Sequence, residues 1–215
     1  MITRRDASAG LAATLVGATG TGVASAAEKQ LPPARVAGGM SLTEALRARR
    51  SIREYADKTL SPQVLSDLLW SAFGINRPNG DRTAPYWRHI MVIDVYAVMA
   101  DGVWLYEPKR HVLLPHLSTD LRAQTGLQDF VANAPLNLVY VGHGERMHDV
   151  TPDERRLYAS VDAAFIGQNV YLFCASEELA TVFRGAVDTV KLGKAMQLGA
   201  EQFVTFAQTV GYSRA

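Results

Sequence analysis

Apolar positions that recur every three to four residues mark one predicted helix of the chain. It lies between a Ser61-Pro62 start, where Ser61 is the N-cap and Pro62 occupies the first turn, and a stop at Gly74. Within these limits the apolar residues are Leu65, Leu68, Leu69, Ala72 and Phe73, a spacing that gives a helix one buried face. The polar, turn-rich stretch 75–85 follows and is predicted to be a loop.

Two further helices are predicted from their start signals. Ser41 and Glu44 form a capping box, in which each side chain satisfies a backbone N–H of the other residue, so a helix should run from there to about Arg49. The stretch Thr151-Pro-Asp-Glu154 starts a long helical pattern to about Leu179. Residues 163–175 are almost wholly apolar, which predicts that this helix is buried on most sides.

Strands are expected where β-branched and aromatic residues are dense. The first two are joined through Asp101-Gly102, a typical hairpin turn. The segments with strand character are 90–99, 103–106, 136–141 and 203–210, the last ending at Gly211. Because helices and strands interleave without regular βαβ spacing, the sequence predicts an α+β fold.

The amino terminus reads as a targeting segment. Arg4-Arg5 precedes a weakly apolar run, 7–23, and a small-x-small cleavage pattern at Ala24-Ser-Ala26. The paired arginines resemble a twin-arginine signal, with an ordinary secretory signal as the alternative. We therefore predict a signal peptide at 1–26, a linker at 27–40, a domain at 41–215, and a periplasmic or secreted protein. The run is too short and glycine-rich for a stable membrane anchor.

Composition and residue spacing argue against several classes of function, among them nucleic-acid binding, metal binding and Rossmann-type dehydrogenation. A formal net charge of +1 over 215 residues gives no basic surface for nucleic acid. The single cysteine, Cys174, lies in apolar sequence and is expected to be an inert packed thiol. His111, His116, His143 and His148 lack zinc-site spacing and are expected to be exposed, so no metal site is predicted. No glycine-rich nucleotide fingerprint occurs, which disfavours a Rossmann dehydrogenase.

A cluster of cationic residues lies at the end of the helix predicted from Ser41 to about Arg49. Arg49, Arg50, Ser51 and Arg53 place three guanidiniums and a hydroxyl within five residues, and arginine side chains match phosphate oxygens in pairs. The cluster is interpreted either as a site for a phosphate dianion or as a solvated helix end that complements the helix dipole.

The ordered motifs of the chain resemble those of the nitroreductase family, and specifically its azoline-oxidase-like, SagB-type dehydrogenase branch. The resemblance covers nearly the whole chain after the targeting segment. Its motifs are residues 49–55, 65–78, 82–85, 93–96, 102–106, 134–135, 168–172, 180–188 and 210–212. It implies a mixed, mainly antiparallel sheet flanked by helices in an intertwined homodimer, with FMN bound between the subunits.

The resemblance also assigns residues to that FMN. Arg49, Arg50, Ser51 and Arg53 would hold its phosphate and ribityl chain. Val182, Phe183, Arg184 and Gly185 would run along the isoalloxazine, with a backbone N–H of Arg184 or Gly185 at flavin N5; the alternative is a plain turn before a helix at Val190. Gln128 would contact the pyrimidine edge or is a surface glutamine. The chain ends at Ala215, so Arg214 is the remaining C-terminal candidate for the phosphate.

One stretch departs from the family pattern. After residues 82–85 the family often has a serine and then an asparagine or similar polar residue that reaches the partner's flavin, whereas this chain has Tyr86 and His89. Either Tyr86, Trp87 and His89 form an aromatic wall over the flavin, or Trp87 fills the core.

The implied activity is hydride transfer through flavin N5 to or from a small-molecule substrate, without a predicted catalytic side chain. The family divides between reduction of nitroaromatics or quinones by NAD(P)H and oxidation of substrates such as azolines. Outside the cytoplasm NAD(P)H is scarce, so the expected reductant is a quinol, a redox partner protein or the substrate that the enzyme oxidises. The alternative is a non-catalytic flavin-binding or scaffold protein with the same fold.

Overall fold

A computed structural model of the protein describes residues 27–214. The predicted signal peptide therefore lies outside the described residues, and its cleavage and export remain predictions. Among the described residues, no helix combines the length and the apolar character that crossing a membrane requires.

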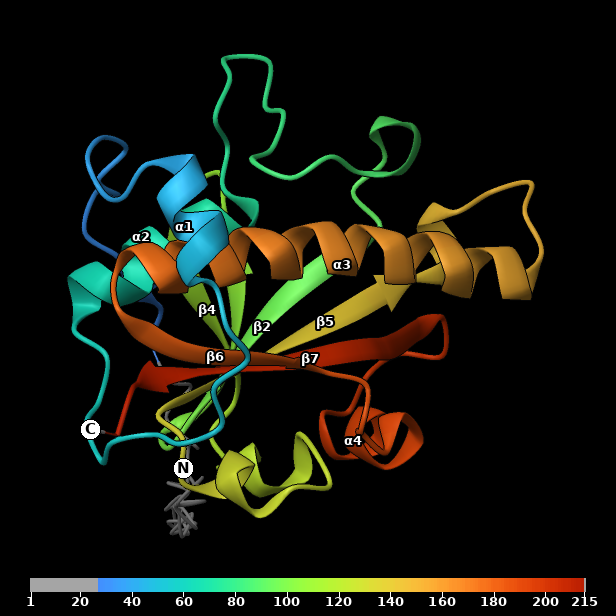
Figure 1. The fold of residues 1–215 in the computed structure, drawn as a ribbon. Helices are drawn as coiled ribbons and strands as arrows, with labels where there is room; N and C mark the ends of the chain where they lie inside the picture. Colours follow the sequence, from blue (N-terminus) through green and yellow to red (C-terminus); the bar gives the residue numbers. More distant parts are fainter. Residues whose placement is uncertain (1–26, 215) are drawn as a thin grey trace, which may run out of the picture.

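A seven-stranded sheet forms the centre of the domain (Figure 1), and every strand pairing in it is antiparallel. In spatial order the strands are β1 Lys29–Gln30, β4 Val112–Leu117, β3 Gly102–Glu107, β2 Ile93–Met99, β5 Leu136–His143, β7 Gln202–Tyr212 and β6 Leu179–Arg184. The predicted α+β class is confirmed. Strands β1, β4 and β6 were not predicted, and β6 forms one edge of the sheet.

Helices cover both faces of this sheet (Figure 1). The helices α1 Leu42–Ala48, α2 Pro62–Phe73 and α3 Pro152–Ser176 lie on one face. The other face carries α4 Thr189–Ala195 and the short turns η2 Arg122–Gln124 and η3 Asp129–Ala132. Two more single turns, η1 Trp87–His89 and η4 Gly144–Arg146, lie in connections between elements.

The predicted helix starts are confirmed at the level of individual hydrogen bonds. Ser41 with Glu44, and Thr151 with Glu154, form the two capping boxes, and Ser61 accepts from the Val64 N–H at 3.2 Å. The long helix ends three residues before the predicted limit of Leu179. Glu178 there has a φ of 55°, a left-handed conformation that reverses the chain into β6.

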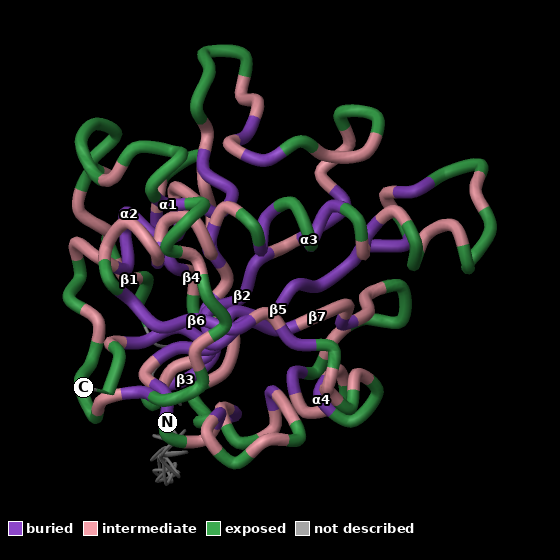
Figure 2. The backbone as a smooth tube through the Cα atoms, in the orientation of Figure 1, coloured by how far each residue is buried: buried purple, intermediate pink, exposed green. Residues whose placement is uncertain are grey.

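Most buried residues form two layers, one on each face of the sheet, and Figure 2 shows that the strands between them are buried along much of their length. A third, small cluster consists of Tyr55, Ala134 and Ala180. The larger layer packs α2 and α3 against the sheet and includes Leu68, Leu138, Tyr140, Ile166 and Cys174. The predicted burial of Cys174 is confirmed, and this burial raises the pKa of its thiol, which keeps it protonated. The smaller layer packs α4 against the opposite face.

The segment 27–40, which the sequence indicated as a linker, packs on the domain. Its strand β1 pairs Lys29 with Leu113 and Gln30 with Val112. The Arg35 backbone N–H and Nε each donate to the Asp67 carboxylate at 2.7 Å. Proline and glycine residues oppose regular structure locally, but they do not prevent pairing with a strand that is distant in sequence.

Candidate functional site

The arginine cluster lies where α1 gives way to extended chain beside the edge strand β6. The Ile52 N–H donates to the Thr181 carbonyl at 2.9 Å, which holds this segment along the strand. The side chains of Arg50, Ser51 and Arg53 are exposed and that of Arg49 is half-buried. Within residues 27–214, none of these three guanidiniums is in an ion pair. Their charge is therefore available to an anion.

A tyrosine that the sequence analysis did not single out joins the cluster to β6. The Tyr171 hydroxyl on α3 lies 2.8 Å from Ser51 Oγ and accepts the Phe183 backbone N–H at 2.9 Å. The Arg49 guanidinium lies over the Tyr171 ring, 5.1 Å from its centroid. These contacts depend on tertiary structure, because Ser51 and Tyr171 are 120 positions apart in the chain.

The free edge of β6 explains which of its backbone groups a ligand can reach. Thr181 and Phe183 direct their backbone groups outward, toward Ile52 and Tyr171. Alternate residues of a strand direct their N–H groups to the same side, and the Arg184 N–H points toward β7, where Arg184 pairs with Ala207. Gly185 directly follows the last residue of β6, so the same alternation, extended by one residue, turns the Gly185 N–H outward. The Gly185 N–H forms no backbone hydrogen bond within the described residues.

Gly185 is exposed and leaves open space at this edge. A Cβ built on it would meet only the Phe206 ring, at 3.6 Å, which is an ordinary van der Waals distance. Packing within the chain therefore does not require glycine at this position. A glycine is instead favourable where a ligand approaches the backbone closely.

Gln128 lies beside this edge on the loop between η2 and η3. The Leu127 N–H donates to the Ala186 carbonyl at 3.0 Å, which brings Gln128 next to the segment that follows Gly185. Its Oε1 is buried and has no hydrogen-bond partner in the described structure. A buried carbonyl oxygen without a partner is costly, so this atom is suited to a ligand N–H.

The side chain of Arg184 points away from the edge and into the sheet. It is 3% exposed. Its guanidinium donates to Thr209 Oγ1 at 3.0 Å, to the Thr125 carbonyl at 2.8 Å and to Asn137 Oδ1 at 3.1 Å. Burial lowers the pKa of Arg184 to about 10, which still leaves it charged at neutral pH.

The last residues of the chain approach the arginine cluster from its other side. Tyr55 and Ser213 form an isolated antiparallel bridge, and the Arg214 N–H donates to the Glu54 carbonyl at 3.3 Å. The exposed Arg214 side chain thus starts beside the segment 49–55. Ten of the eleven predicted site residues therefore lie on β6, directly after it, or on segments that are hydrogen-bonded to one another around it: Arg49, Arg50, Ser51, Arg53, Gln128, Val182, Phe183, Arg184, Gly185 and Arg214.

His89 is the exception. Its side chain is 83% exposed, and it follows Trp87, which stacks on Tyr158 of α3 with ring centroids 5.4 Å apart. Tyr158 and Tyr171 are separated along α3 by about 20 Å, at 1.5 Å per residue. Within one protomer, His89 and the arginine cluster therefore lie apart. Trp87 is partly buried against α3 of its own chain.

The prediction that the remaining histidines are exposed is wrong for three of the four. His111 is partly buried between Ser66 Oγ, at 2.6 Å, and the Tyr106 hydroxyl, at 2.9 Å. His116 bonds to the Met196 carbonyl at 2.6 Å. His143 is 4% exposed, and only His148 is exposed.

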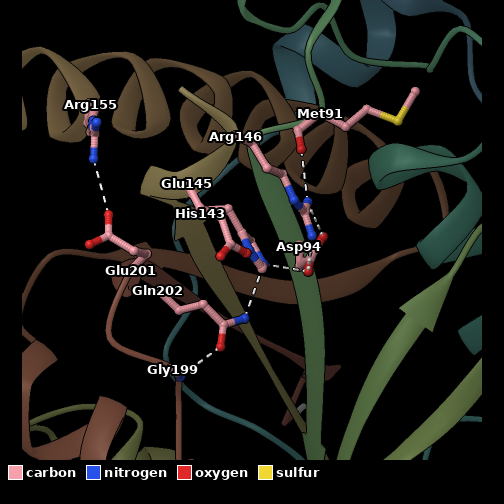
Figure 3. A network of polar contacts seen from close by, with 9 residues as sticks. All are labelled: Met91, Asp94, His143, Glu145, Arg146, Arg155, Gly199, Glu201 and Gln202. Atoms are coloured by element: carbon pink, nitrogen blue, oxygen red, sulfur yellow. Dashed lines mark hydrogen bonds and ion pairs between the residues drawn. The ribbon is translucent and has the colours of Figure 1, made fainter. Parts of the chain in front are cut away.

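His143 is the last residue of β5 and belongs to a polar network (Figure 3), whereas Asn137, which contacts Arg184, lies near the start of that strand. His143 Nε2 lies 2.6 Å from Asp94 Oδ2, and Arg146 donates to both oxygens of the same carboxylate. Asp94 has a lowered pKa; burial opposes this shift, but the hydrogen bonds from His143 and Arg146 outweigh it. The network joins β2, β5 and the turn η4, and we interpret it as structural. Among the described residues, no group of acidic, histidine or cysteine side chains could hold a metal ion.

A cavity of about 570 Å³ lies away from the edge of β6, between β1, the start of α2 and the β2–β3 turn. It is lined mainly by apolar side chains. Its charged side chains are already paired: Lys29 with Asp101, and Arg122 with Asp120. The cavity therefore offers no unpaired charge for catalysis, and the edge of β6 remains the candidate site.

Comparison with known proteins gives consistent results. The family model described as "Nitroreductase family" matches residues 46–212. A protein of Methanocaldococcus jannaschii named as a nitroreductase is 31% identical over 157 residues, which cover 68% of this chain and 79% of that protein. A solved structure from Ralstonia eutropha JMP134, also named as a nitroreductase, has a TM-score of 0.84 and 38% identity, covering 87% of this chain and 90% of that chain. The NADPH:FMN oxidoreductase of Vibrio harveyi, solved with NAD⁺, has the same fold, with a TM-score of 0.60 and 20% identity over 81% of this chain and 69% of that chain.

Proposed function

Because this chain belongs to the nitroreductase family, whose members are typically flavin-dependent oxidoreductases, we propose that it binds FMN and transfers hydride to or from a small molecule through flavin N5. The observation that carries the proposal is the free edge of β6. There, the outward Gly185 N–H lies on the same strand edge as the contacts that hold the arginine cluster.

The residues at this edge fit FMN in three respects. Arg49, Arg50 and Arg53 offer unpaired positive charge for a phosphate. Gly185 leaves its backbone open to a ring that approaches closely. The buried, unpartnered Oε1 of Gln128 can accept the N–H of the pyrimidine edge.

Each of these groups has a role in binding and orientation. The arginine cluster and Ser51 hold the phosphate end, with Arg214 as a further cation. The Tyr171 oxygen accepts from Phe183 and its hydroxyl can donate to Ser51 Oγ; in that arrangement the Ser51 hydrogen is left for the ligand. The Gly185 N–H orients the ring at N5. When bound, FMN supplies the site that accepts and donates hydride.

The proposal includes a homodimer. Large apolar side chains are exposed on α1, at Leu42 and Leu46, and on α3, at Leu157, Val161 and Phe165. Each set repeats every four residues and thus forms a stripe on one side of its helix. A second copy that covers these stripes would bring its loop with His89 toward the first subunit's flavin. An obligate dimer of this kind buries more than about 2,000 Å².

The SagB-type branch and export are further parts of the proposal. Support for the branch comes from the motif residues 49–55 and 82–85, and support for export from Arg4-Arg5 and the small-residue pattern that follows. Twin-arginine export carries folded proteins, so FMN would be loaded in the cytoplasm. Outside the cytoplasm, a quinol, a redox partner protein or the substrate that the enzyme oxidises would then reduce the flavin.

A non-catalytic flavin-binding protein is the second candidate. The observation that favours it is Tyr86, whose hydroxyl donates to Asp81 at 2.6 Å and whose ring packs against Phe73. The position where the family often has a serine is therefore occupied by a side chain engaged within its own subunit. In this case the purified protein would be yellow but would not turn over.

One experiment tests both candidates. The full chain is purified from cells, its bound flavin is identified after denaturation, and the flavin absorbance is followed anaerobically with a panel of quinols and NAD(P)H. Bleaching followed by reoxidation with an acceptor supports the enzyme. Bound FMN that no donor reduces supports the binding protein. A colourless protein that does not take up added FMN contradicts both.

A further inference from the structure

Arg184 is a buried cation without a buried anion. All three of its hydrogen-bond acceptors are neutral, namely Thr209, Thr125 and Asn137. Within residues 27–214, no carboxylate lies within ion-pair distance of its guanidinium. The ring of Phe130 lies near it, with its centroid 6.0 Å away.

The fold alone does not account for this charge. Taking a guanidinium out of water is unfavourable unless an opposite charge compensates it, and neutral replacements of similar volume often leave stability unchanged or improved. By contrast, the partly buried guanidinium of Arg122 on the neighbouring turn is paired with Asp120 at 2.8 Å. The difference suggests that the charge of Arg184 acts on a group that the chain itself does not contain.

The position of Arg184 indicates which group this is. It immediately precedes Gly185, and its Nη1 packs so closely on Gly126 that a Cβ there would lie 2.0 Å from it. The same loop continues to Leu127, bonded to Ala186, and to Gln128. The guanidinium thus lies between the two segments that carry the Gly185 N–H and Gln128 Oε1.

We propose that Arg184 sets the reduction potential of the bound FMN, because its unpaired buried charge favours the anionic reduced ring over the neutral oxidised ring. A hydride carries two electrons and one proton. Its arrival at N5 places the proton there and leaves one negative charge on the ring, and Arg184 supplies the opposite charge. This inference rests on the proposed function, since it requires FMN at the edge of β6.

The test compares variants of Arg184 by equilibrium redox titration of the FMN-loaded protein. Arg184→Gln removes the charge but keeps hydrogen-bond donors. Arg184→Lys keeps a positive charge but lacks the planar guanidinium and its paired N–H donors. We expect Arg184→Gln to weaken binding of reduced FMN relative to oxidised FMN about tenfold, which lowers the potential by about 30 mV for a two-electron couple. Arg184→Lys should stay near the wild type at a pH low enough to keep the buried lysine protonated. Arg122→Gln is the matched control, because it removes the same charge beside the exposed carboxylate of Asp120, where water screens the change, and it should not shift the potential.

A second measurement uses only the lysine variant and covers the case in which Arg184→Gln does not fold. A buried lysine has a depressed pKa, so raising the pH should neutralise it and lower the potential more steeply than in the wild type. Parallel pH dependence in Arg184→Lys and the wild type would overturn the inference. So would an unchanged potential in FMN-loaded Arg184→Gln, or equal shifts in Arg184→Gln and Arg122→Gln. A wild-type protein that binds no FMN would instead contradict the proposed function.

Discussion

The hydroxyl oxygens of Ser51 and Tyr171 lie 2.8 Å apart, and the Tyr171 oxygen also accepts the Phe183 N–H at 2.9 Å. One side chain on α3 thereby fixes both the candidate phosphate site and the edge strand beside it. We expect Tyr171→Phe to weaken FMN binding about two- to tenfold, because a neutral hydrogen bond contributes about 0.5–1.5 kcal/mol. Fluorescence titration of the apoprotein measures the change. Tyr158→Phe, on the same helix, is the control and should bind like the wild type.

Replacing Arg49 or Arg53 with alanine should weaken FMN binding about tenfold to a hundredfold. Charge-assisted hydrogen bonds contribute about 1.5–3 kcal/mol, and each 1.4 kcal/mol corresponds to a factor of ten in affinity. Arg47→Ala provides the matched control, since Arg47 is an exposed arginine in the last turn of α1. Equal affinities in all three variants and the wild type would contradict the assigned phosphate site.

Gly185→Ala should separate ligand binding from stability. The added Cβ meets only Phe206, at 3.6 Å, so the apoprotein should unfold at nearly the wild-type temperature while FMN binds more weakly. Gly167→Ala should behave differently, because its Cβ would lie 2.5 Å from Phe183 Cδ2. Overpacking of this kind costs about 1–3 kcal/mol. Thermal unfolding with and without FMN measures both effects. A destabilised Gly185→Ala apoprotein would contradict the inference that the space beside Gly185 is open when no ligand is bound.

Asp162 on α3 should make stability depend on pH. It is buried and accepts the Trp87 N–H at 2.9 Å, and burial raises its pKa to about 6. Between pH 4 and 6 the folded state therefore binds more protons than the unfolded state, whose aspartate has a pKa of about 3.9, so this residue's contribution to stability falls as the pH rises through that window. Asp162→Asn should remove this part of the pH dependence and stabilise the protein at pH 7 by at most about 3 kcal/mol. Urea unfolding at several pH values measures it, and parallel curves for the two proteins would argue against a raised pKa.

The exposed stripe on α3 should be part of the dimer interface. Phe165→Glu places a charge on this stripe and should shift the protein toward monomer, because burial of an unpaired charge is unfavourable. Val190→Glu adds the same charge to an exposed position on α4 and should leave the oligomeric state unchanged. Light scattering at micromolar concentration distinguishes the two. A wild-type monomer loaded with FMN would contradict the shared site.

The sequence alone determined the features that depend on neighbouring residues. The capping boxes at Ser41 and Thr151 act over three positions, and the apolar period of α2 is read within a single helix, so both were predicted correctly. The cluster Arg49–Arg53 was recognisable for the same reason, since its members are adjacent in the chain.

Only the tertiary structure decided the features that depend on contacts between distant segments. Tyr171 meets Ser51 and Phe183 because α3 packs across the sheet beside β6, and neither the helical pattern nor the motif indicates which way its hydroxyl points. His143 was predicted to be exposed from its local sequence, but Asp94, 49 positions away, provides a polar partner that makes its burial possible. The sequence left two candidate donors to flavin N5, the backbone N–H groups of Arg184 and Gly185. The pairing of β6 with β7 was needed to choose Gly185, because strand register determines the direction of each backbone group.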